Sequence, residues 1–335
     1  MKRIVFFLMF FTIPLKAFGQ QNNNKEFDTV IKQWFCAWSL VYKDLYKIDT
    51  LQPVQFVFFD DTYVYSTSSV TIPKGKLIKG YNLLNLKLNW KRAPHHNTLT
   101  LPDKSSVPVG IMSFAAEIPT DKHQSFFVMP LPSFWKKAGV ESKELGLDNL
   151  TTGVFIHEFS HSQQMQSFGN KMTQYEKQNS FGVSFNDDMI QAIFSENKDY
   201  LDLYHSEINS LYTSIIDKEL NKEQLLNGLN FINQRQTNYF KDKYQGLKEI
   251  DDLFLTMEGL GQYSMYLWLI HPKGGKIEKS IAMAGVRRNK KWWSQDEGFV
   301  LFLILERLKA PESWAKDMFG SKVITAIELI KANMK

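Results

Sequence analysis

The chain has 335 residues, 44% of them hydrophobic and 14% aromatic, which is enough apolar material for a large buried core. Its single cysteine excludes an internal disulfide, so stability must come from packing. The net charge of +5 falls to +2 without the three basic residues of the first nineteen positions, which leaves no electrostatic case for a nucleic-acid partner.

The first nineteen residues have the pattern of a secretory signal peptide. Lys2 and Arg3 precede the apolar run IVFFLMFFTIPL, and Ala17 and Gly19 are the small residues of a cleavage site. The run is about a dozen residues, shorter than the roughly 20 that cross a bilayer. We therefore expect residues 1–19 to be removed and residues 20–335 to be periplasmic or secreted, with no stable membrane span. A retained signal anchor is the alternative.

The next segments predict one helix and then several strands. From Phe27 to Tyr46 apolar residues recur at spacings of three and four, which indicates an amphipathic helix, and we expect Cys36 within it to be a buried thiol. Between Pro53 and Pro132 the chain changes to short β-like runs separated by Asp, Pro, Gly and Lys. These runs are PVQFVFF, TYVYS, NTLTL, VGIMSFA and SFFVMPL.

Beyond Leu150 the apolar period is helical nearly everywhere. Long helices are predicted over residues 187–216, 222–240, 250–270 and 294–309. Ser294 and Glu297 stand in capping-box spacing at the start of the last one. Strands followed by helices predict an α+β fold. We expect a single domain, with residues 20–150 as its helix and β-rich part and residues 151–335 as its helical part.

The segment GVFIHEFSHSQQMQ, residues 153–166, contains His157, Glu158 and His161 in the pattern H-E-x-x-H. Residues four apart lie on one face of a helix, so both imidazoles can bind one zinc ion, Zn²⁺. Glu158 can then take a proton from water on the open side of the ion. The alternative is a helix whose histidines only pack or form hydrogen bonds.

The helix that carries this motif has plausible ends in the sequence. Asp148, Asn149 and Thr151 offer side-chain oxygens for an N-cap, and Gly169 with Asn170 provides a C-terminal stop.

A third metal ligand is expected on another helix. Glu258 is the only charged residue between Asp252 and His271, and a carboxylate is costly to bury there unless it is paired or binds a cation. The adjacent Gly259 and Gly261 suggest that another backbone approaches closely.

Three other residues remain candidates for the same role, namely Glu196, His205 and Asp187. Glu258 could instead pair with Arg235 or a lysine.

HEFSHSQQ followed by MEGLGQY resembles the gluzincin clan of zinc metallopeptidases, in which a second helix supplies a glutamate, often as E-G-x-x-x-Y. The resemblance extends from about Val109 to Leu269. It implies a zincin-like mixed sheet packed on the HExxH helix, followed by a mostly helical half. It also implies zinc bound by His157, His161 and Glu258, and an edge strand that holds extended substrate, here residues 109–117.

We therefore expect an exported zinc-dependent hydrolase, in the first instance a peptidase, with Glu158 as general base and a peptide or protein as substrate. Two alternatives stay open: a metal-dependent hydrolase or lyase for other substrates, and a catalytically silent binding protein. By analogy Tyr263 could stabilise an oxyanion, but it stands about 140° around the helix from Glu258, so we expect it to pack.

Overall fold

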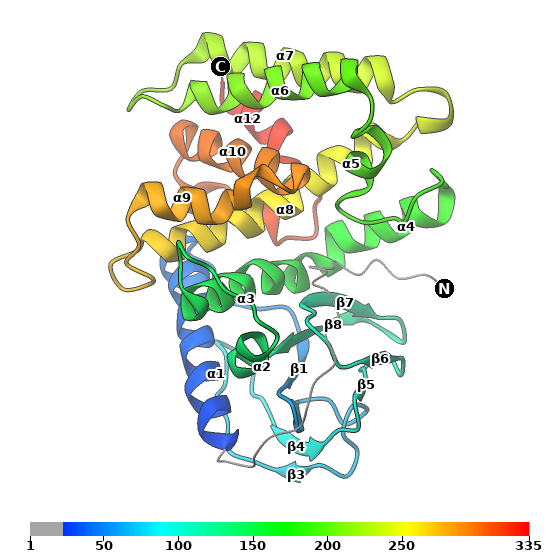
Figure 1. Cartoon of the computed structure of the whole chain (residues 1–335), viewed down its shortest axis with the longest axis vertical. Helices are drawn as coiled ribbons and strands as arrows, with labels where there is room; N and C mark the ends of the chain where they lie inside the picture. The colour runs from blue at the N-terminus through cyan, green and yellow to red at the C-terminus, as the bar shows by residue number, and fades with distance from the viewer. Residues whose placement is uncertain (1–22, 335) are drawn as a thin grey trace. The chain divides into compact units, whose positions relative to one another are not determined.

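The computed structural model describes residues 23–334, so the predicted signal peptide lies outside the described residues (Figure 1). The chain divides into two compact units. One contains residues 23–166 with Met265–Gly285, and the other contains Ser167–Ser264 with residues 286–334. Strands occur only in the first of these, and from Leu147 onward every described element is helical. The predicted mixture of a β-rich part and a helical C-terminal half is confirmed.

The first unit is built on a six-stranded mixed sheet in the order β3-β4-β2-β1-β8-β7. All neighbouring strands are antiparallel except β1 and β8, which are parallel. A separate hairpin is formed by β5 and β6. The strands are β1 Val54–Phe59, β2 Tyr63–Ser66, β3 Lys76–Leu77, β4 Lys91–Pro94, β5 Thr98–Thr100, β6 Ser106–Pro108, β7 Phe114–Ile118 and β8 Asp121–Pro130.

Strand β7 is the last strand of the sheet, as predicted for an edge. The strand is shorter than expected, because it begins at Phe114 rather than at residue 109. It lies against helix α3 (Leu147–Gln164), which carries the HEFSH segment.

Side chains of β1 alternate between two apolar layers, as the period of a strand requires. Phe56 and Phe58 face α3 and the N-terminal helix α1 (Asn23–Ser39), while Val57 and Phe59 belong to a cluster on the other face of the sheet. The ring of Phe159 on α3 stacks on Phe56 with centroids 5.3 Å apart. The HEFSH helix is therefore packed directly on the sheet.

The predicted helix from Phe27 to Tyr46 is confirmed as α1, which continues as a π-helix over Leu40–Leu45. The prediction that Cys36 is buried is wrong, because its thiol is exposed. Trp34 and Trp38 form the buried stripe of this helix, and position 36 is about 200° away from each of them.

The second unit is entirely helical in its described residues. Its helices are α4 Asn170–Gln178, α5 Met189–Phe194, α6 Lys198–Ser214, α7 Lys222–Tyr239, the N-terminal part of α8 Leu247–Ile270, α10 Trp293–Leu308, α11 Ala315–Met318 and α12 Ala326–Asn333. Helices α2 Pro132–Lys137 and α9 Lys279–Arg287 complete the order. None of the helices between residues 23 and 334 has the length and hydrophobicity of a transmembrane span.

The single helix predicted over residues 187–216 is wrong, because the chain breaks between α5 and α6. Asn197 occupies the N-cap of α6, and its side-chain oxygen accepts a hydrogen bond from the Tyr200 N–H at 3.0 Å. Asparagine bonds its own backbone in this way more favourably than it continues a helix. The apolar period on both sides hides the break.

The predicted caps of two helices are also wrong. The N-cap of α10 is Trp292, without a side-chain cap, and Glu297 instead binds Arg235. The N-cap of α3 is Gly146, so none of the proposed oxygens caps it. Residues 169 and 170 are not a stop, because α3 continues through the π-helix Met165–Gly169 into α4.

A buried arginine joins four helices of the second unit. Arg235 on α7 donates from all five of its N–H groups, twice to Glu207 and once each to Asp251, Glu297 and the Tyr200 hydroxyl, at 2.7–3.0 Å. Three carboxyl groups therefore share one cation. Burial raises the pKa of Glu297 well above its usual range, although Arg235 opposes the shift.

The neighbouring carboxyl of Asp252 gives this unit a pH-dependent stability. Burial, together with the charge of Asp251, raises the pKa of Asp252 to about 6, although Gln236 donates to it at 2.8 Å. A raised pKa in the folded state stabilises the fold below the unfolded pKa, and that contribution is lost as the pH rises through 6. We expect the free energy of unfolding to fall by up to about 3 kcal/mol between pH 4 and pH 7 from this group.

Urea unfolding of Asp252→Asn across this pH range tests the expectation. The fall should be smaller in the variant by this amount, whereas Asp202→Asn, at an exposed position, should leave the fall unchanged. An unchanged pH dependence in Asp252→Asn would mean that this carboxyl is not the group responsible.

Helices α8 and α10 touch through their backbones. A Cβ added at Gly259 would overlap the carbonyl group of Gly298, and one added at Gly298 would overlap the Leu255 carbonyl oxygen. The predicted close approach at Gly259 is confirmed. The backbone that approaches it is that of α10.

We expect Gly259→Ala to lower the free energy of unfolding by about 1–3 kcal/mol, because the two backbones must separate. This result would run against the higher helix propensity of alanine, worth about 1 kcal/mol. Denaturant unfolding measures it, with Gly110→Ala as control, since a Cβ there meets nothing within 4 Å. Unchanged or increased stability would show that the helices can move apart freely.

Candidate metal centre

The HEFSH helix presents different chemistry on opposite faces. Phe155 and Phe159 contact the aromatic layer over the sheet. His157 and His161 each lie two residues further along, which is about 200° around the helix. Every residue from Thr151 to Gln164 is nevertheless buried, so the histidines are enclosed rather than exposed to solvent.

Several polar groups of this buried helix have hydrogen-bond partners within the same compact unit. The Ser125 hydroxyl donates to the Ser162 carbonyl oxygen at 3.0 Å, and the Gln52 N–H donates to Gln163 Oε1 at 2.8 Å. Ser160 returns its hydroxyl to the Ile156 carbonyl oxygen. Buried polar groups need such partners, and the bonds also hold α3 at one rotation about its axis.

The two imidazoles converge on one point. Their Nε2 atoms are 3.2 Å apart, the rings stand at 85° to each other, and the side chains are 3% and 0% exposed. Two ligands at 2.0–2.1 Å from a tetrahedral ion are themselves separated by about 3.3 Å. The spacing of the nitrogens therefore suits a shared ion, and in its absence it permits a hydrogen bond between the rings.

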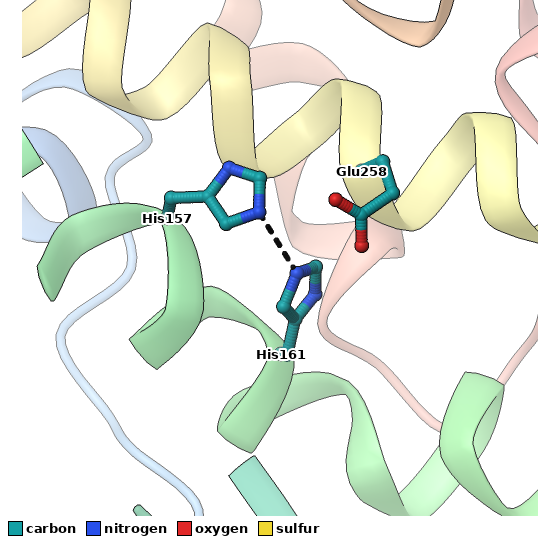
Figure 2. Close-up of side chains that lie close together, drawn as sticks. All are labelled: His157, His161 and Glu258. Atoms are coloured by element: carbon teal, nitrogen blue, oxygen red, sulfur yellow. Dashed lines mark hydrogen bonds between the residues drawn. The ribbon is translucent and has the colours of Figure 1, made fainter. Parts of the chain in front are cut away.

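Glu258 lies on α8 and is 1% exposed. Within the sheet-containing unit, Gly153, one turn before His157, lies against Met265 in the C-terminal part of α8. Glu258 stands about two turns before Met265 on the same continuous helix. The ligand atoms of His157, His161 and Glu258 all lie within 4.8 Å of one another (Figure 2).

Among the side chains that the structure describes, no other set of three or more histidine, cysteine or acidic groups converges in this way. Glu196 is exposed in the turn before α6, and His205 is exposed on that helix. Asp187 is buried, and burial together with the charge of Glu258 raises its pKa well above the usual range, but it is not one of the three. Arg235 donates all its N–H groups to other residues than Glu258.

Glu158, the predicted general base, is 2% exposed and lies within the buried stretch of α3. Its proton-transfer role stays a prediction. Tyr263 packs as expected, with its ring 6.0 Å from those of Phe302 and Trp314.

Two glutamines near Glu258 were not anticipated. Gln295 Nε2 on α10 donates to Glu258 Oε2 at 3.1 Å, and Gln262 Nε2 donates to Gln295 Oε1 at 2.6 Å. Gln262 could have been noticed as an amide in the apolar run LGQYSM. Gln295 had no such signal, since the segment SQDE is typical of an exposed first turn.

The chain was compared with models of protein families, with curated proteins and with solved structures, and none of these comparisons found a match.

From the site geometry we expect about one zinc ion per chain, measured by elemental analysis of protein produced from Gln20 onward. His157→Ala and Glu258→Ala should abolish binding, because each removes a ligand. Glu196→Ala is the matched control and should keep the ion, since this glutamate is exposed. Loss of zinc in Glu196→Ala, or no zinc in the wild type, would contradict the ligand set.

Proposed function

We propose that the chain is an exported zinc-dependent hydrolase, and specifically a peptidase of the gluzincin type. The observation that supports this proposal is the convergence of two imidazole nitrogens and one carboxylate, all buried, beside a second buried glutamate. Two histidines and a carboxylate with one open position form the ligand set of catalytic zinc.

In this proposal His157, His161 and Glu258 hold the ion. When bound, such an ion acts as a Lewis acid that lowers the pKa of water and polarises a carbonyl group. The Glu158 carboxylate accepts a proton from the attacking water. It returns that proton to the amide nitrogen as the C–N bond breaks, so that the amine leaves neutral.

Strand β7 provides a means to hold an extended peptide. It pairs with β8 on one side only, and it lies against α3. An edge strand offers backbone N–H and C=O groups that can pair with an added strand. A substrate bound there would lie alongside the helix that carries His157 and Glu158.

Glu158→Gln tests the chemistry separately from the metal. The variant should bind zinc as the wild type does, because residue 158 is not a ligand. Its rate on a peptide library should fall by about 100- to 10,000-fold, the usual contribution of general acid–base catalysis.

The outcome also separates the alternatives. Cleavage of esters or glycans with peptides untouched would favour a different metal-dependent hydrolase. Stoichiometric zinc without any hydrolysis in the wild type would leave the binding protein as the better description.

A further inference from the structure

Glu258 is connected to a short chain of buried amides. Gln295 on α10 donates to Glu258 Oε2, and Gln262, one turn beyond Glu258 on α8, donates to Gln295. The three side chains are 1%, 7% and 3% exposed for Glu258, Gln295 and Gln262. No charged group takes part in these two hydrogen bonds other than the carboxylate itself.

The direction of this chain follows from the carboxylate at one end. A carboxylate that ligates a metal ion only accepts hydrogen bonds, so in the proposed site the group of Gln295 that faces Glu258 is the NH₂, as in the structure. Gln295 then presents its oxygen to Gln262, which donates from its own NH₂. Because Gln262 holds the oxygen, the amide of Gln295 is kept in the one orientation that donates to Glu258.

The close contact between α8 and α10 allows the side chain of Gln295 to reach Glu258. Gly298 is one turn beyond Gln295, Gly259 adjoins Glu258, and these two glycines are in backbone contact. With a side chain at either glycine, α10 would lie further from α8.

Both residues that follow Gln295 are also anchored. Asp296 accepts from Arg287 at 2.7 Å and from the Tyr212 hydroxyl at 2.8 Å, and Glu297 accepts from Arg235 at 2.9 Å. The first turn of α10 therefore has little freedom to rotate, and Gln295 stays directed at Glu258.

We propose that Gln295, oriented by Gln262, is a positioning residue that restricts Glu258 to ligation through a single oxygen. This inference rests on the proposed metal site. A carboxylate can bind a metal with one oxygen or with both. Binding through both oxygens would require Oε2 to serve the ion and the buried NH₂ of Gln295 at once, whereas ligation through Oε1 alone leaves this hydrogen bond undisturbed. One-oxygen ligation keeps three protein ligands and an open fourth position, as catalytic zinc requires.

Cobalt(II) is the probe for this proposal, because its visible absorption is more intense in four-coordinate than in five-coordinate sites. We expect the wild type to show the four-coordinate spectrum. Gln295→Met keeps the side-chain volume but removes the donor, so its absorption should weaken as Glu258 binds through both oxygens. We also expect the cobalt Kd to rise ten- to a hundredfold, the usual effect of losing a hydrogen bond to a ligand.

A matched control uses another buried glutamine that donates to carboxylates of α8. Gln236 binds Asp251 and Asp252 at 3.2 and 2.8 Å, and Gln236→Met should leave spectrum and affinity unchanged. Gln262→Met should change the spectrum in the same direction as Gln295→Met. If Gln295→Met does not fold, Gln262→Met is the variant that tests the proposal.

The possible results distinguish this proposal from the one on which it rests. Cobalt bound by the wild type, with the same spectrum and affinity in Gln295→Met or in a soluble Gln262→Met, would overturn the positioning role and leave the metal site intact. An equal change in Gln236→Met would also overturn it, as a general effect of buried glutamines. No cobalt or zinc in the folded wild type would overturn both proposals.

Discussion

The attachment of α3 to the sheet is the constraint on which the candidate centre depends. Phe155 and Phe159 stack against rings of the sheet and of α1 on one side of the helix. A helix held by residues four apart cannot rotate without exposing that face. The residues two positions further on, His157 and His161, are therefore held on the opposite face, with their nitrogens 3.2 Å apart. Aromatic packing on the sheet side thus fixes the positions of the two imidazoles, as metal binding on the other side would require.

The second requirement is that a polar helix can be buried at all. From Thr151 to Gln164 the helix includes serines, glutamines and two histidines, yet all of them are buried. Its hydrogen bonds with Ser125 and Gln52 come from β8 and from the residues just before β1. Strand β8, which packs against the phenylalanines, and the residues before β1 thus also provide partners for Ser162 and Gln163, and the two effects favour one orientation of the helix.

Most of the correct predictions came from the spacing of residues that are close together in the sequence. The position of His157 relative to His161 follows from a four-residue interval, and the isolation of Glu258 in an apolar run indicated a buried carboxylate with a specific role. The break at Asn197 and the missing capping box at Ser294 could not be predicted with equal ease. The apolar residues on both sides of Asn197 keep a helical spacing, so the spacing does not reveal the N-cap. Glu297 does not complete a capping box, because it accepts a hydrogen bond from Arg235, which lies 62 residues away in the sequence.

The hydrogen bond that joins Glu258 to α10 comes from Gln295, which is distant in the sequence. The second unit contains a buried cation, Arg235. Three carboxyl groups and a tyrosine hydroxyl accept all the hydrogen bonds that it donates. Glu258 receives a neutral amide from Gln295 instead. An arginine partner would offset the negative charge of Glu258 and weaken its attraction for a cation, whereas an amide orients the carboxylate and leaves that charge in place. Because Arg235 donates all its N–H groups to other residues, its carboxyl partners hold helices together, and the hydrogen bond from Gln295 leaves Glu258 with the charge that a metal ligand would require.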